Sequence, residues 1–184
     1  MSYACLHQQE FTEEPYRMEP LRYEDIFLIK KWRNEQIDIL RQKIFLTDAM
    51  QMAYFENVIQ PSFALDQPDQ ILFSYFKEGK LIGYGGMVHI DWKAKQGEVS
   101  FLVETGRAKK TPVYQADFGS FLKLIKTVAF QDLGFKRLFT ITYDIRPLHI
   151  SILETSGFIA ETRLKNEMDI KDKLVDVLIH GCER

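Results

Sequence analysis

The spacing of apolar and polar positions becomes regular only after the first fifteen residues. It predicts a short strand over residues 16–21 and a helix over residues 23–34. A second helix is predicted after Thr47, which can cap it, and Pro61 is expected to end it. Residues 1–15 are polar and show no sustained period, so they are predicted to form an N-terminal tail.

Three strands are predicted next, over residues 71–77, 81–90 and 98–103. The first two flank Glu78-Gly79, a short turn typical of a hairpin. Because all three strands have short links, we expect them to pair in an antiparallel fashion.

Beyond Val103 the spacing becomes helical. Residues 104–117 are predicted to be a polar loop, and a helix is expected from about Gly119 to Leu133, ended by Gly134. A strand over 137–143, a short helix over 147–156 and two final strands complete the chain. A strand–helix–strand unit beside an antiparallel meander predicts a mixed sheet in one α/β (α+β) domain over residues 16–184.

Composition and charge narrow the classes of partner. Hydrophobic residues make up 46% of the chain and charged residues 27%, which excludes disorder and a disulfide scaffold. The net charge of −2 leaves no basic excess for a nucleic acid, and no apolar run is long enough for a membrane. Cys5 and Cys182 are expected to be unpaired thiols in a cytoplasmic protein, with a clip between the two ends as the alternative.

Five segments, in this order, resemble the GNAT superfamily of N-acetyltransferases. They are IKKWRNEQ (29–36), KEGKLIGYGGM (77–87), GEVSFLV (97–103), GSFLKLIKTVAFQDLGFKRL (119–138) and HISILETSGF (149–158). The branch they resemble contains the ribosomal-protein N-terminal and amino-sugar acetyltransferases. The resemblance implies a single-domain GNAT fold, with a mostly antiparallel central sheet of about seven strands flanked by about four helices. It also implies acetyl-CoA as co-substrate.

The resemblance assigns residues to the acetyl-CoA site. In the family, the fourth strand contacts the pantetheine arm through its backbone, and the start of the cofactor helix binds the pyrophosphate. Arg146 stands where relatives often carry asparagine, and it could pair with a CoA phosphate or with an anion on the acceptor. The residues implied are Phe101, Leu102 and Val103 on the strand, Phe118, Gly119 and Ser120 at the helix start, and Arg146.

One residue departs from the family pattern. The family places Q/R-x-x-G-x-G/A before the cofactor helix, whereas the matching stretch here, residues 114–119, keeps only its last glycine. Asp117 takes the place of the middle one. A carboxylate there would repel the pyrophosphate, so we expect it to cap the helix or to pair with Lys109 or Lys110.

Acetyl transfer to an amine needs a base for the amine and is helped by a proton donor for the departing thiolate. Glu98 is the first candidate for the base, directly or through a water, with a solvated strand-edge glutamate as the alternative. His149 is the second candidate, because an imidazole titrates in the useful range. The family's usual tyrosine donor is replaced by Leu153, which leaves Tyr143 as the candidate acid or as a core aromatic.

The four histidines and two cysteines show no metal-ligand spacing, so no metal is expected. The predicted function is the transfer of an acetyl group from acetyl-CoA to a small-molecule primary amine by direct attack in a ternary complex. We expect an amino sugar, linked to a nucleotide, or a small metabolite, in a pocket framed by residues 32–59 and 165–174. A protein N-terminal acetyltransferase and a non-catalytic acyl-CoA-binding regulatory module are the alternatives, and a homodimer is left open.

Overall fold

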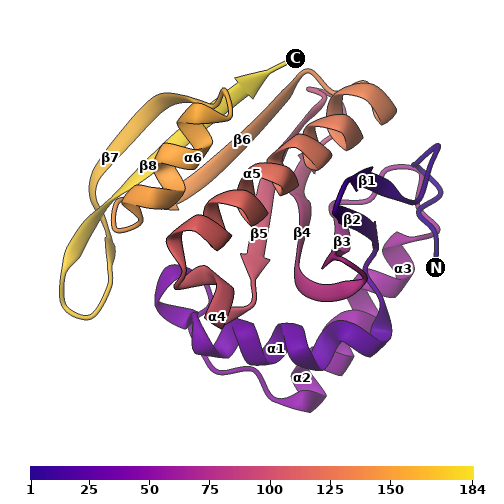
Figure 1. The fold of residues 1–184 in the computed structure, drawn as a ribbon, viewed down its shortest axis with the longest axis horizontal. Helices are drawn as coiled ribbons and strands as arrows, with labels where there is room; N and C mark the ends of the chain where they lie inside the picture. Colours follow the sequence, from indigo (N-terminus) through magenta and orange to yellow (C-terminus); the bar gives the residue numbers. More distant parts are fainter.

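The strands form one sheet in the order β1-β2-β3-β4-β5-β6-β8-β7 in a computed structural model that describes all of residues 1–184 (Figure 1). All neighbouring strands pair antiparallel except β5 and β6, which are parallel. The predicted mixed, mostly antiparallel sheet is confirmed, with eight strands instead of seven. The strands are β1 (Phe11–Glu13), β2 (Tyr16–Pro20), β3 (Ile71–Lys77), β4 (Lys80–Asp91), β5 (Gln96–Val103), β6 (Arg137–Tyr143), β7 (Ile159–Asp169) and β8 (Leu174–Glu183).

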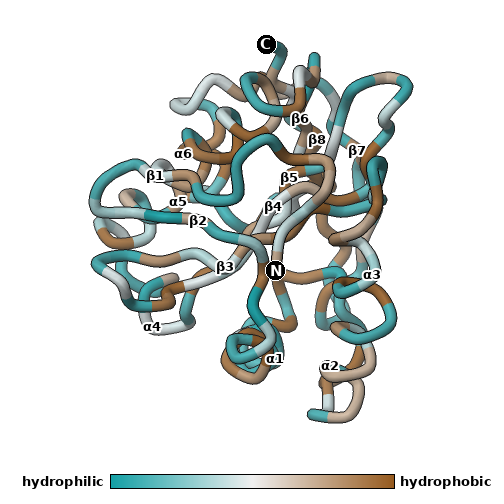
Figure 2. The backbone as a smooth tube through the Cα atoms, turned by 90° about the vertical axis from the view of Figure 1, so that its right-hand side faces the viewer, coloured by the Kyte–Doolittle hydropathy of each residue, from teal (hydrophilic) through white to brown (hydrophobic).

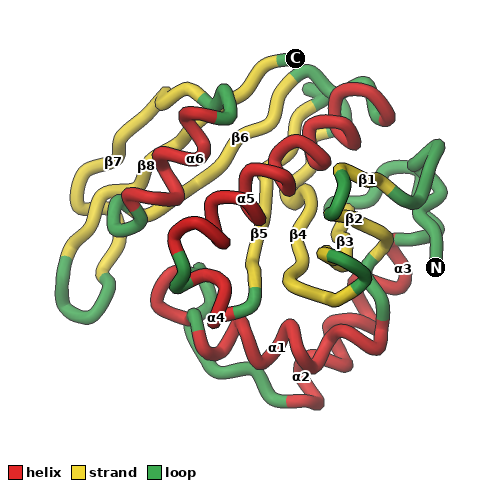
Figure 3. Tube along the Cα trace, viewed as in Figure 1, coloured by secondary structure: helices red, strands yellow, loops and turns green.

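Helices cover both faces of this sheet. Helices α5 and α6 lie over one face, α2 and α3 lie over the other, and α1 runs along the lower end of the sheet (Figures 1, 2 and 3). None of the helices combines the length and apolar character needed to cross a membrane. The helices are α1 (Ile26–Glu35), α2 (Asp48–Tyr54), α3 (Gln60–Ser62), α4 (Thr105–Ala108), α5 (Thr111–Lys126) and α6 (Pro147–Thr155).

The second predicted helix begins as expected but ends later. The Thr47 hydroxyl accepts a hydrogen bond from the Met50 N–H at 3.2 Å and caps α2. A π-helical turn, Phe55–Ile59, then leads into α3, so Pro61 does not end the helical run. Proline is tolerated there because it falls in the first turn of α3, where its missing N–H group is not needed.

The N-terminal residues are packed against the sheet, so the prediction of a tail over residues 1–15 was wrong. Strand β1 pairs with β2, and Phe11 is buried in the core. Tyr3 is only 1% exposed, and its hydroxyl donates to the Leu72 carbonyl at 3.1 Å and accepts from the Leu72 N–H at 2.8 Å. Isolated aromatic residues anchor this segment, and they create no period that a sequence pattern could reveal.

Helix α5 starts eight residues earlier than predicted, at Thr111, with Pro112 in its first turn. The apolar stripe of this helix contains a buried carboxylate, Asp117, and this interruption made the first two turns resemble a polar loop. The far end agrees with the prediction, because a π-helical turn, Thr127–Asp132, is followed by Gly134 in the left-handed conformation at φ +64°.

One hydrophobic cluster unites the helices and the sheet, and Figure 2 shows hydrophobic residues along the central strands. The Phe121 ring of α5 packs 4.6 Å from the Phe101 ring of β5, measured between ring centroids. Gly85 on β4 permits this contact, since a Cβ atom there would lie 2.7 Å from the Phe121 ring and 2.3 Å from the Ser100 carbonyl oxygen. Both cysteines are free thiols, as predicted.

Candidate active site

The parallel strands β5 and β6 pair only over Gln96–Glu98 and then diverge. Beyond that point β5 remains paired with β4, and β6 with β8, so the strands part as Figure 1 shows. A cavity of about 290 Å³ lies where they separate, lined by both strands, by α5 and α6, and by residues 39–42 between α1 and α2. The facing edge of β5 beyond Glu98 pairs with no strand, so a ligand can use its backbone groups.

Phe101, Leu102 and Val103, the strand residues assigned to the acetyl-CoA site, do not all face the cavity. The Phe101 side chain lines the cavity, whereas the side chains of Leu102 and Val103 are buried in the core. The carbonyl of Val103 already accepts a hydrogen bond from Gln36 Nε2 at 2.9 Å. Ser100, on the same strand, also lines the cavity.

Thr140 on β6 gives the cavity wall a polar group in need of a partner. Its Oγ1 atom is buried and has no hydrogen-bond partner within the protein. Buried hydroxyl groups are normally hydrogen-bonded. An elongated ligand with amide groups, such as the pantetheine arm of CoA, fits both this hydroxyl and the free edge of β5 opposite.

Glu98 lies where the two strands begin to part. Its side chain lines the cavity and the residue is only 3% exposed, so it is not a solvated strand-edge glutamate. One carboxylate oxygen contacts the Arg41 guanidinium, and the other lies 2.8 Å from His89 Nδ1. His89 occupies a bulge in β4 at φ +48° and exposes 67% of its side chain, so it links the buried carboxylate to solvent.

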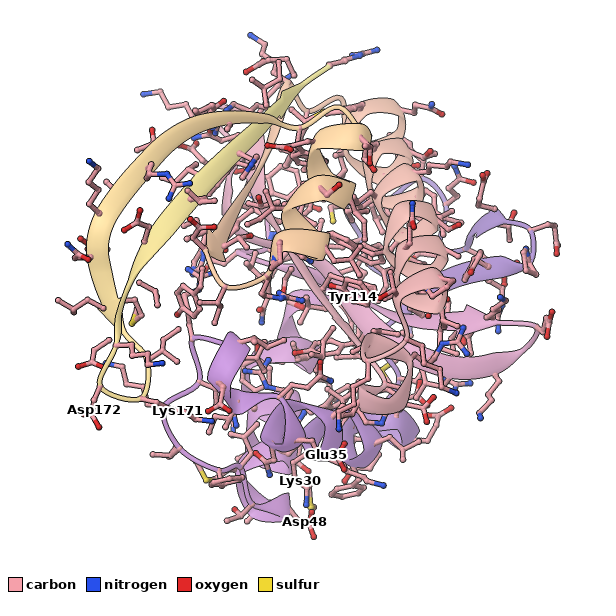
Figure 4. The ribbon with its side chains drawn as sticks, turned by 60° about the vertical axis from the view of Figure 1, so that its left-hand side comes forward. Lys30, Glu35, Asp48, Tyr114, Lys171 and Asp172 are labelled. Atoms are coloured by element: carbon pink, nitrogen blue, oxygen red, sulfur yellow. The ribbon has the colours of Figure 1, made fainter.

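The segment that supplies Arg41 also meets the β7–β8 hairpin. Lys171 Nζ, at the hairpin tip, lies 2.6 Å from Asp38 Oδ2 just before the cavity-lining residues 39–42. Figure 4 labels Lys171 and Asp172 at this tip. The two segments predicted to frame an acceptor pocket are therefore in contact beside the cavity.

His149 on α6 also lines the cavity. Its Nδ1 atom lies 2.7 Å from the Tyr114 hydroxyl, which accepts a hydrogen bond from Arg146 Nη2 at 2.8 Å. The Phe118 ring stacks on the imidazole at 4.2 Å between centroids, and Phe118 also faces the cavity. Burial, then the charge of Arg146 and then His180, hold the pKa of His149 well below 6.5. The imidazole is therefore uncharged at neutral pH.

Tyr143, the candidate acid, ends β6 with its side chain buried against the same cavity. Burial raises the pKa of its hydroxyl, and the nearby Arg41 charge opposes that rise. The phenol is therefore protonated at neutral pH, and its hydroxyl makes no hydrogen bond within the protein.

Gly119 and Ser120 do not lie at a helix N-terminus, so their predicted placement was wrong. They lie about two turns inside α5, and a Cβ atom at Gly119 would meet no atom within 4 Å. The true start of the helix is preceded by Lys109 and Lys110, both exposed and neither in an ion pair. Helix N-termini bind phosphate through their free N–H groups and dipole, so an anion site fits the start of α5 at Thr111.

Asp117 neither caps the helix nor pairs with a lysine. Its fully buried carboxylate accepts hydrogen bonds from Arg107 Nε at 2.7 Å and Arg107 Nη2 at 2.8 Å. The Tyr16 hydroxyl adds a third at 3.1 Å. The predicted ion pair exists, but with Arg107 as the partner, and this pairing neutralises the charge that would otherwise repel a phosphate.

A second pocket, of about 400 Å³, adjoins the first and shares Arg33 and Ser100 with it. Its wall is mostly apolar, with Ile29, Met50 and Tyr54 among the lining residues. Arg33 donates to Gln42 Oε1 at 2.9 Å and to the Tyr84 hydroxyl, yet it forms no ion pair with any carboxylate.

The site residues predicted from the sequence did not include Arg33, Arg41 and Thr140, which all line the cavity. Arg33 carried a usable signal, because it shares the inward side of α1 with Ile26 and Ile29. A charge on the apolar side of a helix needs a partner, which can be a ligand. Arg41 and Thr140 carried no such signal, because only the folded chain brings them beside Glu98 and the cavity.

Comparison with known proteins identifies the fold. A family model described as an acetyltransferase (GNAT) domain matches residues 19–179. A spermidine N-acetyltransferase from Vibrio cholerae, solved with CoA and spermine, is similar with a TM-score of 0.78 and 14% identity over 93% of this chain and 96% of that one. Its dodecameric structure in an intermediate state gives a TM-score of 0.73 and 15% identity over 93% of this chain and 95% of that one.

A structure described as a probable acetyltransferase has a TM-score of 0.73 and 15% identity, covering 95% of this chain and 97% of that one. No curated protein matches the sequence. None of these three structures is described as a ribosomal-protein or amino-sugar acetyltransferase, the branch that the sequence resembled. The family model spans the strands β3 to β6 and the cavity between β5 and β6, and this chain belongs to the GNAT acetyltransferase family, as an acetyl-CoA-dependent N-acetyltransferase.

Proposed function

We propose that this enzyme acetylates the primary amine of a small molecule that also carries a negative charge, such as an amino sugar linked to a nucleotide. The observation that carries the proposal is Arg33, a partly buried cation at the junction of the two pockets with no carboxylate partner. A buried charge without a partner is costly, and an anionic group on the acceptor would offset that cost.

In this proposal the acetyl donor occupies the cavity between β5 and β6. The free edge of β5 and Thr140 Oγ1 offer hydrogen bonds to the pantetheine arm. Lys109, Lys110 and the N-terminus of α5 would hold the pyrophosphate, since all three favour negative charge. The donor supplies an acetyl group activated as a thioester.

Glu98 would accept the proton of the attacking amine, directly or through one water. Its carboxylate is held in place by Arg41, and His89 connects it to solvent, so the proton has a route out of the buried site. Tyr143 would donate a proton to the departing sulfur, because its phenol is protonated and faces the cavity.

The charges around the cavity argue against a polyamine as the acceptor. Three arginines line it (Arg33, Arg41 and Arg146), and Glu98 is its one carboxylate. Arg41 already pairs with that carboxylate. Two unit charges of the same sign 4 Å apart repel by about 4 kcal/mol at an effective dielectric constant of 20. The apolar second pocket would instead accommodate the uncharged body of an acceptor whose anionic group meets Arg33.

A panel of amines assayed for CoA release tests the proposal. It contains a neutral amino sugar, a nucleotide-linked amino sugar, spermidine and a peptide with a free N-terminus. We expect kcat/KM to be at least about tenfold higher for the anionic amine, the difference of one charge-assisted hydrogen bond. Arg33→Met should remove that preference, whereas Arg17→Met on β2, which lines neither pocket, should retain it.

Two results would count against this function. Spermidine as the best acceptor would refute the assignment of an anionic amine. Tight acetyl-CoA binding without turnover of any amine would favour a non-catalytic acyl-CoA-binding module.

A further inference from the structure

Three polar side chains form a continuous hydrogen-bonded chain at the cavity wall. Arg146 Nη2 lies 2.8 Å from the Tyr114 oxygen, which lies 2.7 Å from His149 Nδ1. Tyr114 is on α5, while Arg146 immediately precedes α6 and His149 lies in its first turn, so the chain spans both helices that cover this face of the sheet. Figure 4 shows Tyr114 in the interior beside α5.

The donors and acceptors in this chain determine where the proton of His149 lies. A guanidinium has only donors, so the Tyr114 oxygen must accept from Arg146. If His149 Nδ1 also donated to that oxygen, the proton of the buried Tyr114 hydroxyl would have no acceptor. The arrangement that satisfies all three groups has Tyr114 donating to Nδ1, which places the single imidazole proton on Nε2.

The surroundings of His149 oppose a second proton on the ring. Arg146 contributes a positive charge from its own helix, and Tyr114 of α5 is a neutral phenol whose pKa is raised by burial. His180 of β8 is fully buried and also opposes protonation of His149. No carboxylate pairs with His149 itself, since Glu154 is the acidic group 3.8 Å from His180.

The Nε2 atom of His149 is available to a ligand. It has no hydrogen-bond partner in the protein, and the ring lines the cavity between β5 and β6. Phe118 stacks on the ring at an interplanar angle of 11° and fixes its plane. Leu153, one turn further along α6, is fully buried and has no group that could donate.

We propose that His149 is a neutral Nε2–H donor that hydrogen-bonds the negative charge developing on the thioester during acetyl transfer, with Tyr114 and Arg146 as positioning residues that fix its tautomer. This assignment rests on the proposed function and replaces the role of base that the sequence suggested for His149. No proton leaves the imidazole, so the ring is unchanged after each turnover. Preorganised donors of this kind stabilise a transition state because they need no reorientation when charge develops.

The tautomer can be measured without any acceptor. Nitrogen-15 NMR of the histidine-labelled protein at pH 7 should show His149 protonated at Nε2 and unprotonated at Nδ1. Addition of acetyl-CoA should shift the Nε2–H resonance, whereas Tyr114→Phe should give a mixture of tautomers. A proton on Nδ1 in the wild type, or an Nε2–H signal unaffected by acetyl-CoA, would overturn the proposal.

Kinetics of a matched pair of variants separate donation from packing. Glutamine places an N–H donor near the position of Nε2, whereas leucine has none. We expect His149→Leu to lower kcat by about 10²–10³-fold, the effect of removing one such donor. The kcat of His149→Gln should be at least about tenfold higher than that of His149→Leu. The dissociation constant of acetyl-CoA should change less than threefold in both variants. Equal kcat values for the two variants would contradict the assignment.

Tyr3→Phe serves as the control for loss of a buried hydroxyl. Tyr3 also makes two hydrogen bonds in the core but lines neither pocket. Its removal should lower the melting temperature and leave kcat and the His149 tautomer unchanged. Failure of the proposed function can be distinguished from failure of the His149 proposal. In the first case no amine would be acetylated, yet the NMR experiment would still report the His149 tautomer and its response to acetyl-CoA.

Discussion

Arg107 and Asp117 form a two-pronged ion pair across the junction of α4 and α5, with nitrogen–oxygen distances of 2.7 and 2.8 Å. Asp117 is fully buried inside α5, while Arg107 comes from the one-turn helix before it. The pair ties the intervening segment to the body of α5. That segment carries Lys109 and Lys110, so the ion pair holds the proposed pyrophosphate site in place.

Asp117→Asn should therefore reduce both stability and acetyl-CoA affinity. We expect the free energy of unfolding, measured in urea, to fall by about 3 kcal/mol, because removing one partner of a buried pair leaves the other uncompensated. Calorimetry should show weaker acetyl-CoA binding, since the lysines lose their anchor. Unchanged stability would show that the pair contributes little to the fold.

A double-mutant cycle provides the control for that prediction. Arg107→Met combined with Asp117→Leu should cost less than the sum of the two single changes, because the double variant leaves no unpaired charge. Lys123→Met breaks an exposed ion pair with Glu13 and should cost less than about 1 kcal/mol. Additive effects at Arg107 and Asp117 would contradict coupling between them.

The sequence predicted the sheet well because strands such as β3 and β4 are mostly buried runs joined by a tight turn. It failed where single side chains with distant partners decide the structure. Tyr3 is anchored by Leu72, and Asp117 by Arg107 and Tyr16. No local pattern reveals these pairs, so a packed N-terminus looked like a tail and two helical turns looked like a loop.

The candidate site was predictable only in part. The position of Glu98 at the start of the diverging strand, where it lines the cavity, follows from the resemblance to the family. The environment of that carboxylate did not, because Arg41 comes from a distant segment and His89 is turned toward it by a bulge. The chemistry of a side chain depends on these partners, so its role can be assigned only from the folded structure.

Glu98→Gln should lower kcat by about 10²–10⁴-fold, the usual contribution of a general base. The amide keeps the shape of the side chain but cannot accept the proton of the amine. Acetyl-CoA affinity should stay within threefold. Glu78→Gln, in the exposed β3–β4 turn, is the matched control and should retain normal turnover. Near-normal turnover of Glu98→Gln at neutral pH would leave Glu98 as only a structural partner of Arg41.

Stability should depend on pH through His149. The pKa of this imidazole is well below 6.5 in the folded chain, whereas the unfolded chain titrates near the ordinary value. Below about pH 6.5 the unfolded state therefore binds a proton that the native state does not, so stability falls as pH falls, by up to about 1.4 kcal/mol per pH unit. Above that pH this contribution is constant.

Urea unfolding between pH 5 and 7 measures this dependence. The slope of the unfolding free energy against pH should be smaller in His149→Leu by nearly the full contribution of one bound proton, about 1.4 kcal/mol per pH unit. Identical slopes in the wild type and His149→Leu would show that His149 is not held uncharged by the fold.

Gly119→Ala should stabilise the protein and leave acetyl-CoA binding unchanged. A phosphate-binding glycine would give the opposite result, because an added methyl group would obstruct the ligand. Gly119 instead lies inside α5, where a Cβ atom would meet nothing within 4 Å, and alanine favours a helix interior over glycine by about 0.8–1.0 kcal/mol. Gly85→Ala is the contrasting variant, since its Cβ would lie 2.3 Å from the Ser100 carbonyl oxygen and should destabilise the sheet. Thermal unfolding measures the stability of both variants, and calorimetry measures their affinity for acetyl-CoA. A tenfold loss of acetyl-CoA affinity in Gly119→Ala would indicate that the pyrophosphate binds near Gly119, in the middle of α5.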